Sequence, residues 1–267
     1  MSNVDFGGKV LDEDPVPTAP DHYSFSQLQT FLKCPQSYYR KYILKEPWAS
    51  GFGMTTGKAF HIAVESMWKT KSPKSAAKDY DAFWQSVDVS QLLDPPEPED
   101  LGNHKARMLT LADIAYARYS ESLPPKEVEH RFEVGIEDFK VVGVMDLVTQ
   151  DGKVIDWKTG AKPPAQDIAT TSRQLTLYDY AFRQEYGQAP SGLGIIWAGY
   201  LKAGATFEER WAGVRLQKDF DRLVKAFQAL HKAVKNDGPW APAPDGPGIW
   251  WCSEEKCPAW HTCPVRT

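Results

Sequence analysis

The sequence predicts one mixed α/β domain in which helices flank a mostly antiparallel sheet. Apolar residues recur at helical spacing in the first part of the chain, and three β-rich runs follow one another in its middle. A length of 267 residues is enough to bury a substantial core. A composition of 42% hydrophobic and 25% charged residues is that of an ordinary soluble globular protein.

Residues 1–22 are polar and rich in proline and aspartate, so we expect a flexible tail before a single domain over 23–267. Ser24 and Gln27 have the spacing of a capping box, which predicts the start of a helix. The apolar stripe of this helix is Leu28, Phe31 and Leu32. We expect Pro35 to end the helix.

Two longer helices are predicted over 56–69 and 105–119. The buried side of the first is expected to be Phe60, Val64, Met67 and Trp68. Residues 71–100 hold a further amphipathic segment. Its end, 94–100, is acidic and rich in proline, which predicts a loop.

Strands are predicted over 127–136, 139–149 and 153–158, and we expect them to form a meander. The pair Asp151–Gly152 is typical of the turn of a hairpin. The remaining predicted elements are a helix over 172–186 that ends at Gly187, strands over 194–201 and 208–215, and a helix over 218–235. The closing segment, from residue 238, is rich in Pro, Gly, Trp and Cys.

Two acidic residues and a lysine in the predicted meander are the strongest functional signal. Asp156 and Lys158 project from the same face of their strand because side chains alternate. We expect Asp146, on the preceding strand, to reach the same place. Two carboxylates beside an ammonium group suit a hard divalent cation and an anionic substrate. An Asp and a Lys two residues apart more often form a solvated face. The apolar neighbours favour function because an unpaired charge in a core strand is costly.

The four cysteines form a second constellation. Three lie near the C-terminus with C-x4-C-x5-C spacing, and one lies at the end of the first predicted helix: Cys252, Cys257, Cys263 and Cys34. Four thiolates complete a tetrahedral metal site or hold a cubane cluster. The spacing leaves zinc and iron–sulfur open, with His261 as an alternative ligand. Disulfides are disfavoured in a cytosolic chain.

Charge and hydropathy exclude some classes of protein. No apolar run approaches the roughly 20 residues of a membrane span, and the N-terminus lacks a secretory signal pattern. We therefore expect a cytoplasmic protein without a membrane partner. The net charge of −4 argues against a uniformly basic nucleic-acid coat and leaves room for a local groove.

These residues, taken together in their order, resemble the PD-(D/E)XK nuclease superfamily. The resemblance is to the RecB-like exonucleases, which include the CRISPR-associated iron–sulfur exonucleases. It covers most of the chain, from about Tyr23 to Cys263. Its motifs are the segment Ser24–Leu28 leading to Cys34-Pro35, a G-x-x-x-H motif at Gly57–His61, a G-x-x-D motif at Gly143–Asp146, a (D/E)-x-K motif at Asp156–Lys158, and a Q-x-x-x-Y motif at Gln174–Tyr178.

The resemblance implies a restriction-endonuclease-like core and a set of functional residues. A bound Mg²⁺ or Mn²⁺ would be held by His61, Asp146, Asp156 and the backbone carbonyl of Trp157. The catalytic residues would be Asp146, Asp156, Lys158, Gln174 and Tyr178. Taken alone, His61, Gln174 and Tyr178 are more often ordinary core or surface residues. Glu65, one helical turn after His61, is a further candidate for support of the metal.

The resemblance also implies that Cys34, Cys252, Cys257 and Cys263 hold a [4Fe–4S] cluster, with structural Zn²⁺ as the alternative. The cluster lobe would comprise about 24–45 and 238–267 and would join the N-terminal helix to the C-terminal tail. The commonest spacing in this family is C-x2-C-x5-C, whereas the first gap in this sequence is four residues.

The implied function is that of a divalent-metal-dependent DNA exonuclease, acting on single-stranded DNA or DNA ends. Its implied partners are DNA and proteins of recombination, repair or CRISPR adaptation. The alternative is a DNA-end-binding or processing subunit of such a complex, with little cleavage of its own. A zinc-stabilised nucleotide-binding protein is a third reading, but the sequence has no Gly-rich phosphate-binding loop. The aromatic and basic run Tyr38–Tyr42 either stacks on bases or packs its helix against the cluster lobe.

Overall fold

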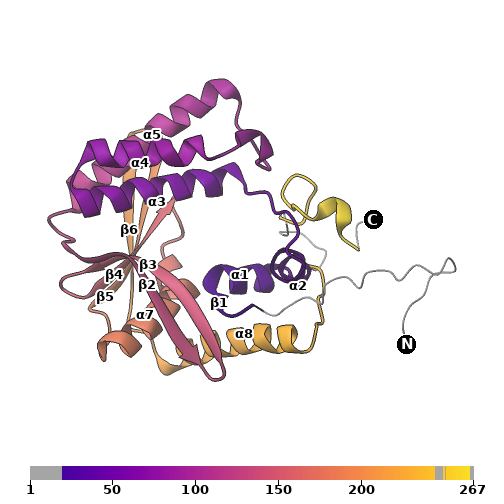
Figure 1. Ribbon diagram of the computed structural model, residues 1–267. Coiled ribbons are helices and arrows are strands. Elements are labelled where there is room, and N and C mark those ends of the chain that lie inside the picture. The colour runs from indigo at the N-terminus through magenta and orange to yellow at the C-terminus, as the bar shows by residue number, and fades with distance from the viewer. Residues whose placement is uncertain (1–19, 244–248, 250, 265–267) are drawn as a thin grey trace.

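A six-stranded mixed sheet organises the protein (Figure 1). The computed structural model describes residues 20–243, 249 and 251–264. The strands are β1 (Tyr23–Ser24), β2 (Pro125–Ile136), β3 (Phe139–Thr149), β4 (Lys153–Thr159), β5 (Gly192–Leu201) and β6 (Gly204–Ala212). Their order is β1-β3-β4-β5-β6, and β2 also pairs with β3.

Strand direction follows from the connections between strands. The pairs β2–β3, β3–β4 and β5–β6 are antiparallel, whereas β1–β3 and β4–β5 are parallel. A parallel pair needs a crossover, and α6 (Ile168–Thr171) with α7 (Arg173–Tyr186) supplies it between β4 and β5. The predicted meander of β2, β3 and β4 and the predicted fold class are confirmed.

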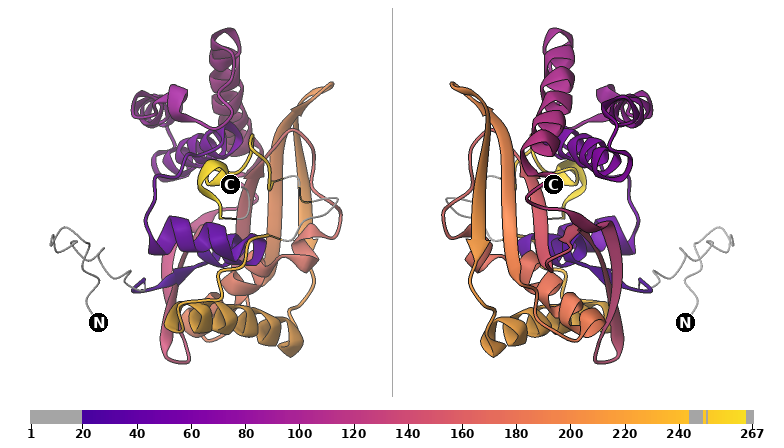
Figure 2. Two further views of the ribbon diagram at one scale, coloured as in Figure 1. Left: turned by 90° about the vertical axis from the view of Figure 1, so that its right-hand side faces the viewer. Right: turned by 90° about the vertical axis from the view of Figure 1, so that its left-hand side faces the viewer.

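Helices cover both faces of the sheet and bury two separate cores. The first core lies beneath α3 (Phe52–Thr70), α4 (Pro73–Gln85) and α5 (Pro98–Tyr119). The second lies beneath α1 (Phe25–Lys33), α7 and α8 (Gln217–Lys235). Figure 2 shows from two sides that the α3–α5 group and α8 lie far apart, at opposite ends of the molecule. The strands that carry the carboxylates predicted from the sequence therefore lie between two different groups of helices, one on each face of the sheet.

The chain bends at Cys34 rather than simply ending a helix there. Ser24 caps α1 by accepting from the N–H of Gln27 at 3.3 Å, as the capping pattern predicts. Cys34 is extended, and Pro35 then begins a second helix, α2 (Pro35–Tyr38), which leads into a π-helical turn, η1 (Tyr39–Ile43). The predicted helix does end before Pro35, at Lys33, but Pro35 also begins a helix that was not predicted, because proline is well tolerated at the first helical position.

Other element boundaries differ from the prediction in ways that local chemistry explains. Helix α5 begins at Pro98, inside the segment expected to be a loop, because proline fits the first turn of a helix. Strand β6 occupies Gly204–Ala212 instead of 208–215, because Gly204 has a φ of 102° and closes a tight turn directly after β5. The short 3₁₀ turns η2 (Val89–Gln91) and η3 (Trp260–Thr262) and helix α6 were not predicted.

The aromatic run after α1 serves packing rather than an open stacking platform. Tyr38 is fully buried, and Tyr38 and Tyr39 stack on Trp240 with ring centroids 5.9 and 5.1 Å apart. Arg40 pairs with Glu46 at 3.1 Å. Of the two readings of this run, packing against the C-terminal part of the chain is therefore the one that the contacts support.

The predicted tail over 1–22 lies almost entirely outside the described residues, as do 244–248, 250 and 265–267 of the predicted cluster lobe. No helix in the part of the chain that the structure describes has the length and apolar character needed to cross a membrane.

Candidate active site

Strand β4 presents Asp156 and Lys158 towards α7, on the face that the alternation predicts. Val154 packs in the core beneath α7, whereas Ile155 and Trp157 pack in the core beneath α3. The Lys158 Nζ lies 3.0 Å from Oδ1 and 2.8 Å from Oδ2 of Asp156. Because Asp156 is only 1% exposed, this ammonium group is the neighbour that stabilises its charge.

Helix α7 holds the lysine from the other side. Lys158 donates to Gln174 Oε1 at 3.0 Å, and Gln174 Nε2 donates to the hydroxyl of Tyr178 at 2.7 Å. Burial lowers the pKa of Lys158, but the carboxylates of Asp156 and Asp146 outweigh this effect and raise its pKa overall. Burial also raises the pKa of Tyr178 well above its usual value, so its hydroxyl keeps its proton. The two helical residues thus fix a charged lysine in place.

Asp146 reaches the same region because β3 and β4 separate. The pairing of these strands is confined to Leu147 with Ile155 and Val148 with Val154. Just beyond the last pair, Oδ2 of Asp146 accepts a hydrogen bond of 2.7 Å from the backbone N–H of Trp157. The side chain of Asp146 thereby replaces a strand partner, and its carboxylate is held at the point where the ladder ends.

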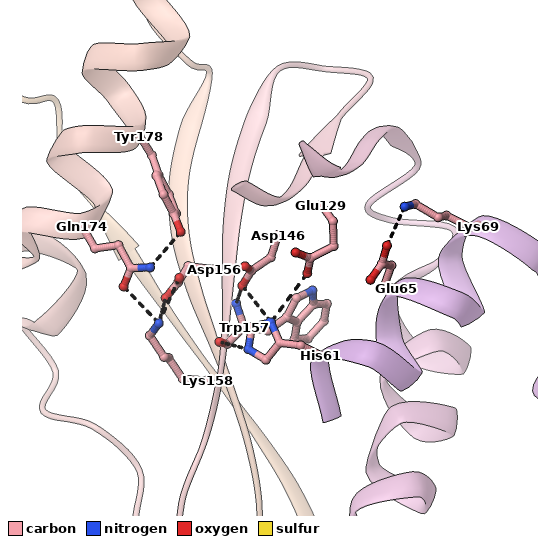
Figure 3. Close-up of polar contacts among 10 residues, drawn as sticks. All are labelled: His61, Glu65, Lys69, Glu129, Asp146, Asp156, Trp157, Lys158, Gln174 and Tyr178. Atoms are coloured by element: carbon pink, nitrogen blue, oxygen red, sulfur yellow. Dashed lines mark hydrogen bonds and ion pairs between the residues drawn. The ribbon is translucent and has the colours of Figure 1, made fainter. Parts of the chain in front are cut away.

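Helix α3 supplies His61 from the opposite face of the sheet (Figure 3). Its Nε2 lies 3.0 Å from the backbone oxygen of Trp157, and its Nδ1 lies 3.6 Å from Oδ2 of Asp146. The same Nδ1 is 3.7 Å from Oε1 of Glu129. The imidazole therefore connects the predicted carbonyl and carboxylate ligands and also contacts a second carboxylate.

Glu129, on β2, is the site residue that the sequence analysis missed. It has a φ of 52°, in the left-handed region that residues other than glycine rarely adopt. The alternation of β2 changes there, since Val128 packs beneath α3 and Phe132 packs beneath α7. The register of the predicted hairpin could have identified Glu129. A turn at 137–138 places residue 129 opposite Asp146, and the observed pair Val128–Leu147 has this register.

Comparison with known proteins places this arrangement in a family. The sequence profile of the PD-(D/E)XK nuclease superfamily matches residues 22–264. The chain belongs to the PD-(D/E)XK nuclease superfamily. No relative was found among curated proteins.

One of the two solved structures compared with this member of the PD-(D/E)XK nuclease superfamily has the same fold. A protein from Eubacterium rectale that has been assigned as an exonuclease superimposes with a TM-score of 0.62. It is 10% identical in sequence, and the alignment covers 86% of this chain and 87% of that one. The protein SSO0001 aligns over 94% of this chain and 89% of its own, with 12% identity and a TM-score of 0.45.

Asp146 and the two acidic or imidazole side chains next to it have the composition of a divalent-cation site, which PD-(D/E)XK nucleases use. Within the described residues, one group of three His, Cys, Asp or Glu side chains has its ligand atoms within 4.8 Å of one another: His61, Glu129 and Asp146. Carboxylate oxygens and an imidazole nitrogen suit Mg²⁺ or Mn²⁺. Asp156 lies beside this group, against Lys158, rather than within it.

The pKa values of His61 and Asp146 are both raised above their usual values. Burial lowers the pKa of His61, but the carboxylates of Asp146 and Glu129 raise it to about 9. Burial raises the pKa of Asp146 to about 7, against the opposing charge of His61. A divalent cation would replace these protons and neutralise the carboxylates. Glu65 lines a cavity together with His61 and Glu129 but forms an ion pair of 2.6 Å with Lys69.

The cysteines gather at the junction of α1, α2 and the C-terminal segment. Cys34, Cys252 and Cys257 line a cavity of about 360 Å³. Burial raises the pKa of Cys257, and the charges of the other three cysteines raise it further. No three of these sulfurs among the described residues lie within 4.8 Å of one another. The alternative ligand His261 is exposed and faces Glu254 at 3.6 Å.

Proposed function

We propose that the protein is a divalent-metal-dependent DNA exonuclease that acts on single-stranded DNA or on DNA ends. One observation carries this proposal: Asp156 and Lys158 lie side by side on β4, next to the Asp146 group. A protein that only binds DNA would have no need of a buried carboxylate held against a charged lysine, because the carboxylate repels the phosphates that the lysine attracts. Hydrolysis of a phosphodiester bond uses both groups.

The residues divide the chemical work between them. His61, Glu129, Asp146 and the carbonyl of Trp157 would hold Mg²⁺ or Mn²⁺, with Asp156 at the side that faces Lys158. The bound ion supplies Lewis-acid activation of water and of the scissile phosphate. Lys158 then donates hydrogen bonds to the attacking water or to the phosphate oxygens as negative charge develops. Gln174 and Tyr178 keep its ammonium group aimed at that position.

Exonuclease action and a DNA substrate rest on resemblance. The Eubacterium rectale protein with the same fold has been assigned as an exonuclease. The RecB-like motifs in this sequence imply the same activity and favour single strands or free ends. Proteins of recombination, repair or CRISPR adaptation are the partners that this resemblance implies.

We further propose that Cys34, Cys252, Cys257 and Cys263 hold a [4Fe–4S] cluster. Three of them, Cys34, Cys252 and Cys257, line one cavity, and the charge of Cys263 acts on Cys257, which supports one cofactor rather than four separate thiols. A single tetrahedral zinc ion would bring its sulfur ligands to about 3.8 Å from one another, given a Zn–S bond of about 2.3 Å. No three of the described cysteine sulfurs lie that close to one another, so the family resemblance is what favours the larger cluster over zinc.

A pair of matched variants tests the proposed catalytic site. Asp156→Asn removes the carboxylate beside Lys158, and Asp151→Asn removes a carboxylate that pairs with Lys153 at the turn of the same hairpin. With Mn²⁺ and an end-labelled single strand, Asp156→Asn is expected to cleave at least about 100-fold more slowly than the parent protein. Asp151→Asn is expected to cleave like the parent protein.

The outcomes separate the two candidate functions. If Asp156→Asn and Asp151→Asn cleave equally well, the catalytic assignment is wrong. A parent protein that binds DNA ends but cleaves no strand would instead be the DNA-end-binding or processing subunit.

A further inference from the structure

A groove leads away from the proposed catalytic site between the N-terminal ends of α7 and α8. Lys158 and Gln174 line a cavity of about 430 Å³ together with Arg173. Arg173 and Thr171 also line a second cavity, of about 480 Å³, whose other wall is the start of α8. The two cavities adjoin at these residues, and we call them together the α7–α8 groove. Helices α7 and α8 lie side by side in Figure 1.

The α7–α8 groove is lined by cations whose side chains have no partner among the residues that the structure describes. Arg173, Lys218 and Arg222 are exposed, and within the described part of the chain none of their side chains forms a hydrogen bond or an ion pair. One carboxylate lines the same cavity, Asp219, and its Oδ2 accepts from the backbone N–H of Leu216 at 2.9 Å. In a chain with a net charge of −4, this is a local excess of positive charge.

A buried arginine fixes the wall of the groove. Arg215 is 5% exposed, and its guanidinium donates to the carbonyls of Ala169 at 2.6 Å and Ser172 at 3.2 Å, and also to that of Thr170. These bonds tie the segment after β6 to the start of α7. The first turns of α7 and α8 are therefore held at the groove, where the positive ends of both helix dipoles add to the field of the cations.

Apolar side chains accompany the cations. Val214 is 82% exposed and Leu216 is 53% exposed, and both line the same cavity as Lys218 and Arg222. Exposed apolar residues beside unpaired cations match a ligand that carries regular negative charges and apolar faces. A nucleic-acid strand has both, in its phosphates and its bases.

We propose that the α7–α8 groove binds the DNA strand on one side of the scissile phosphate, with Arg173, Lys218 and Arg222 as its phosphate contacts. This inference rests on the proposed function, since it extends the substrate beyond the catalytic site. The strand would run from Lys158 past Arg173 to the first two turns of α8. Lys218 and Arg222 are one helical turn apart and face the groove together.

Two variants on α8 test this proposal without altering a residue that contacts Lys158. The double variant Lys218→Ala/Arg222→Ala removes two groove cations, and alanine is well tolerated in a helix. The control, Lys232→Ala, removes an exposed cation of the same helix about 15 Å away along its axis. Binding of a labelled single strand is measured by fluorescence anisotropy with Ca²⁺ in place of Mn²⁺, over a range of salt concentrations.

The double variant is expected to reduce the slope of log K against log[salt] by about 1.4, which is about 0.7 for each lost phosphate contact. The ratio of the parent protein's binding constant to that of the double variant is therefore expected to be about 25-fold larger at 0.1 M salt than at 1 M salt. Lys232→Ala is expected to keep the slope of the parent protein. A double variant whose slope and affinity equal those of Lys232→Ala would overturn the groove assignment.

A small substrate separates this inference from the proposed function. The p-nitrophenyl ester of thymidine monophosphate is a phosphodiester too short to extend along α8. The double variant is expected to lose at least tenfold more activity on the oligonucleotide than on this ester. Equal losses on both substrates would overturn the groove assignment. A parent protein that binds the strand with the expected salt slope but cleaves neither substrate would retain the groove and refute the nuclease.

Discussion

The carboxylate of Asp146 is the hydrogen-bond partner of the backbone of Trp157, with Oδ2 accepting from the N–H at 2.7 Å. This single contact has two consequences. It ends the β3–β4 ladder, and it leaves the carbonyl of Trp157 facing His61 at 3.0 Å. The geometry of the proposed metal site therefore depends on a side chain that is both a ligand and a part of the sheet.

The dual role of Asp146 predicts different effects for two substitutions. Asp146→Asn keeps an oxygen that can accept from Trp157, whereas Asp146→Ala leaves a buried N–H without a partner. Asp146→Ala is therefore expected to be less stable than Asp146→Asn by about 1–3 kcal/mol. Denaturant unfolding of the two proteins without metal measures the difference. Equal free energies of unfolding would show that this hydrogen bond does not stabilise the protein.

The protonation of His61 and Asp146 predicts how pH affects stabilisation by metal. The pKa of His61 is raised to about 9, so its stabilising charge is complete below its usual value of 6.5 and is lost as the pH rises towards 9. The pKa of Asp146 is raised from 3.8 to about 7. Its protonated form therefore contributes stability that is complete below pH 3.8 and is lost as the pH rises to about 7. Both effects weaken the metal-free protein at high pH.

Metal binding shows the opposite dependence on pH because the ion must displace these protons. We expect Mg²⁺ to raise the thermal unfolding midpoint more at pH 8.5 than at pH 6. The midpoint with and without Mg²⁺ at each pH measures this effect. Shifts of equal size at the two pH values would mean that His61 and Asp146 do not bind the ion.

Gly199, on β5, is expected to be intolerant of a side chain. A Cβ there would lie 2.3 Å from the ring of Trp197 and 2.6 Å from the backbone oxygen of Gly160. Gly199→Ala should therefore destabilise the protein by about 1–3 kcal/mol, because neither neighbour can withdraw easily. Gly135→Ala is the control, since a Cβ on that strand residue meets nothing within 4 Å. Thermal midpoints that fall equally for the two variants would contradict this account of packing.

The strand that carries Asp156 and Lys158 could be predicted from the sequence because alternation alone fixes which residues share a face. The contact of Lys158 with Gln174 was also foreseeable, since it needs only one turn of a helix beside that strand. Glu129 was not foreseen because its left-handed backbone breaks the alternation on which the prediction relied. Local rules predict regular elements well, and they fail where the site requires an irregular one.

The second helix after Cys34 escaped prediction for a related reason. Proline ends one helix and begins another with the same local geometry, so Pro35 alone could not distinguish the two. The contact that decides between them is distant in sequence: the N–H of Gln36 donates to the carbonyl of Ala241 at 3.1 Å. Strand β1 was missed similarly, since two residues carry no pattern and only pairing with β3 defines them.

The cysteine proposal predicts the colour and the metal content of the protein. Anaerobically purified protein should be brown, with about four iron and four sulfide ions per chain. Cys34→Ala should yield colourless and less stable protein, because the cluster joins α1 to the C-terminal segment across nearly the whole chain. Metal analysis and visible absorption measure both. Colourless parent protein with one zinc ion would refute the cluster and leave the nuclease proposal standing.

Digestion of single-stranded DNA by the parent protein tests the central claim most directly. A linear strand labelled at one end and a circular strand of similar length are incubated with anaerobically purified protein, with Mn²⁺ or with EDTA. The proposed function predicts that the linear strand is degraded only with Mn²⁺ and that the circle persists. A linear strand that remains intact with Mn²⁺ would contradict nuclease activity, and a circle cut as fast as the linear strand would contradict exonuclease action.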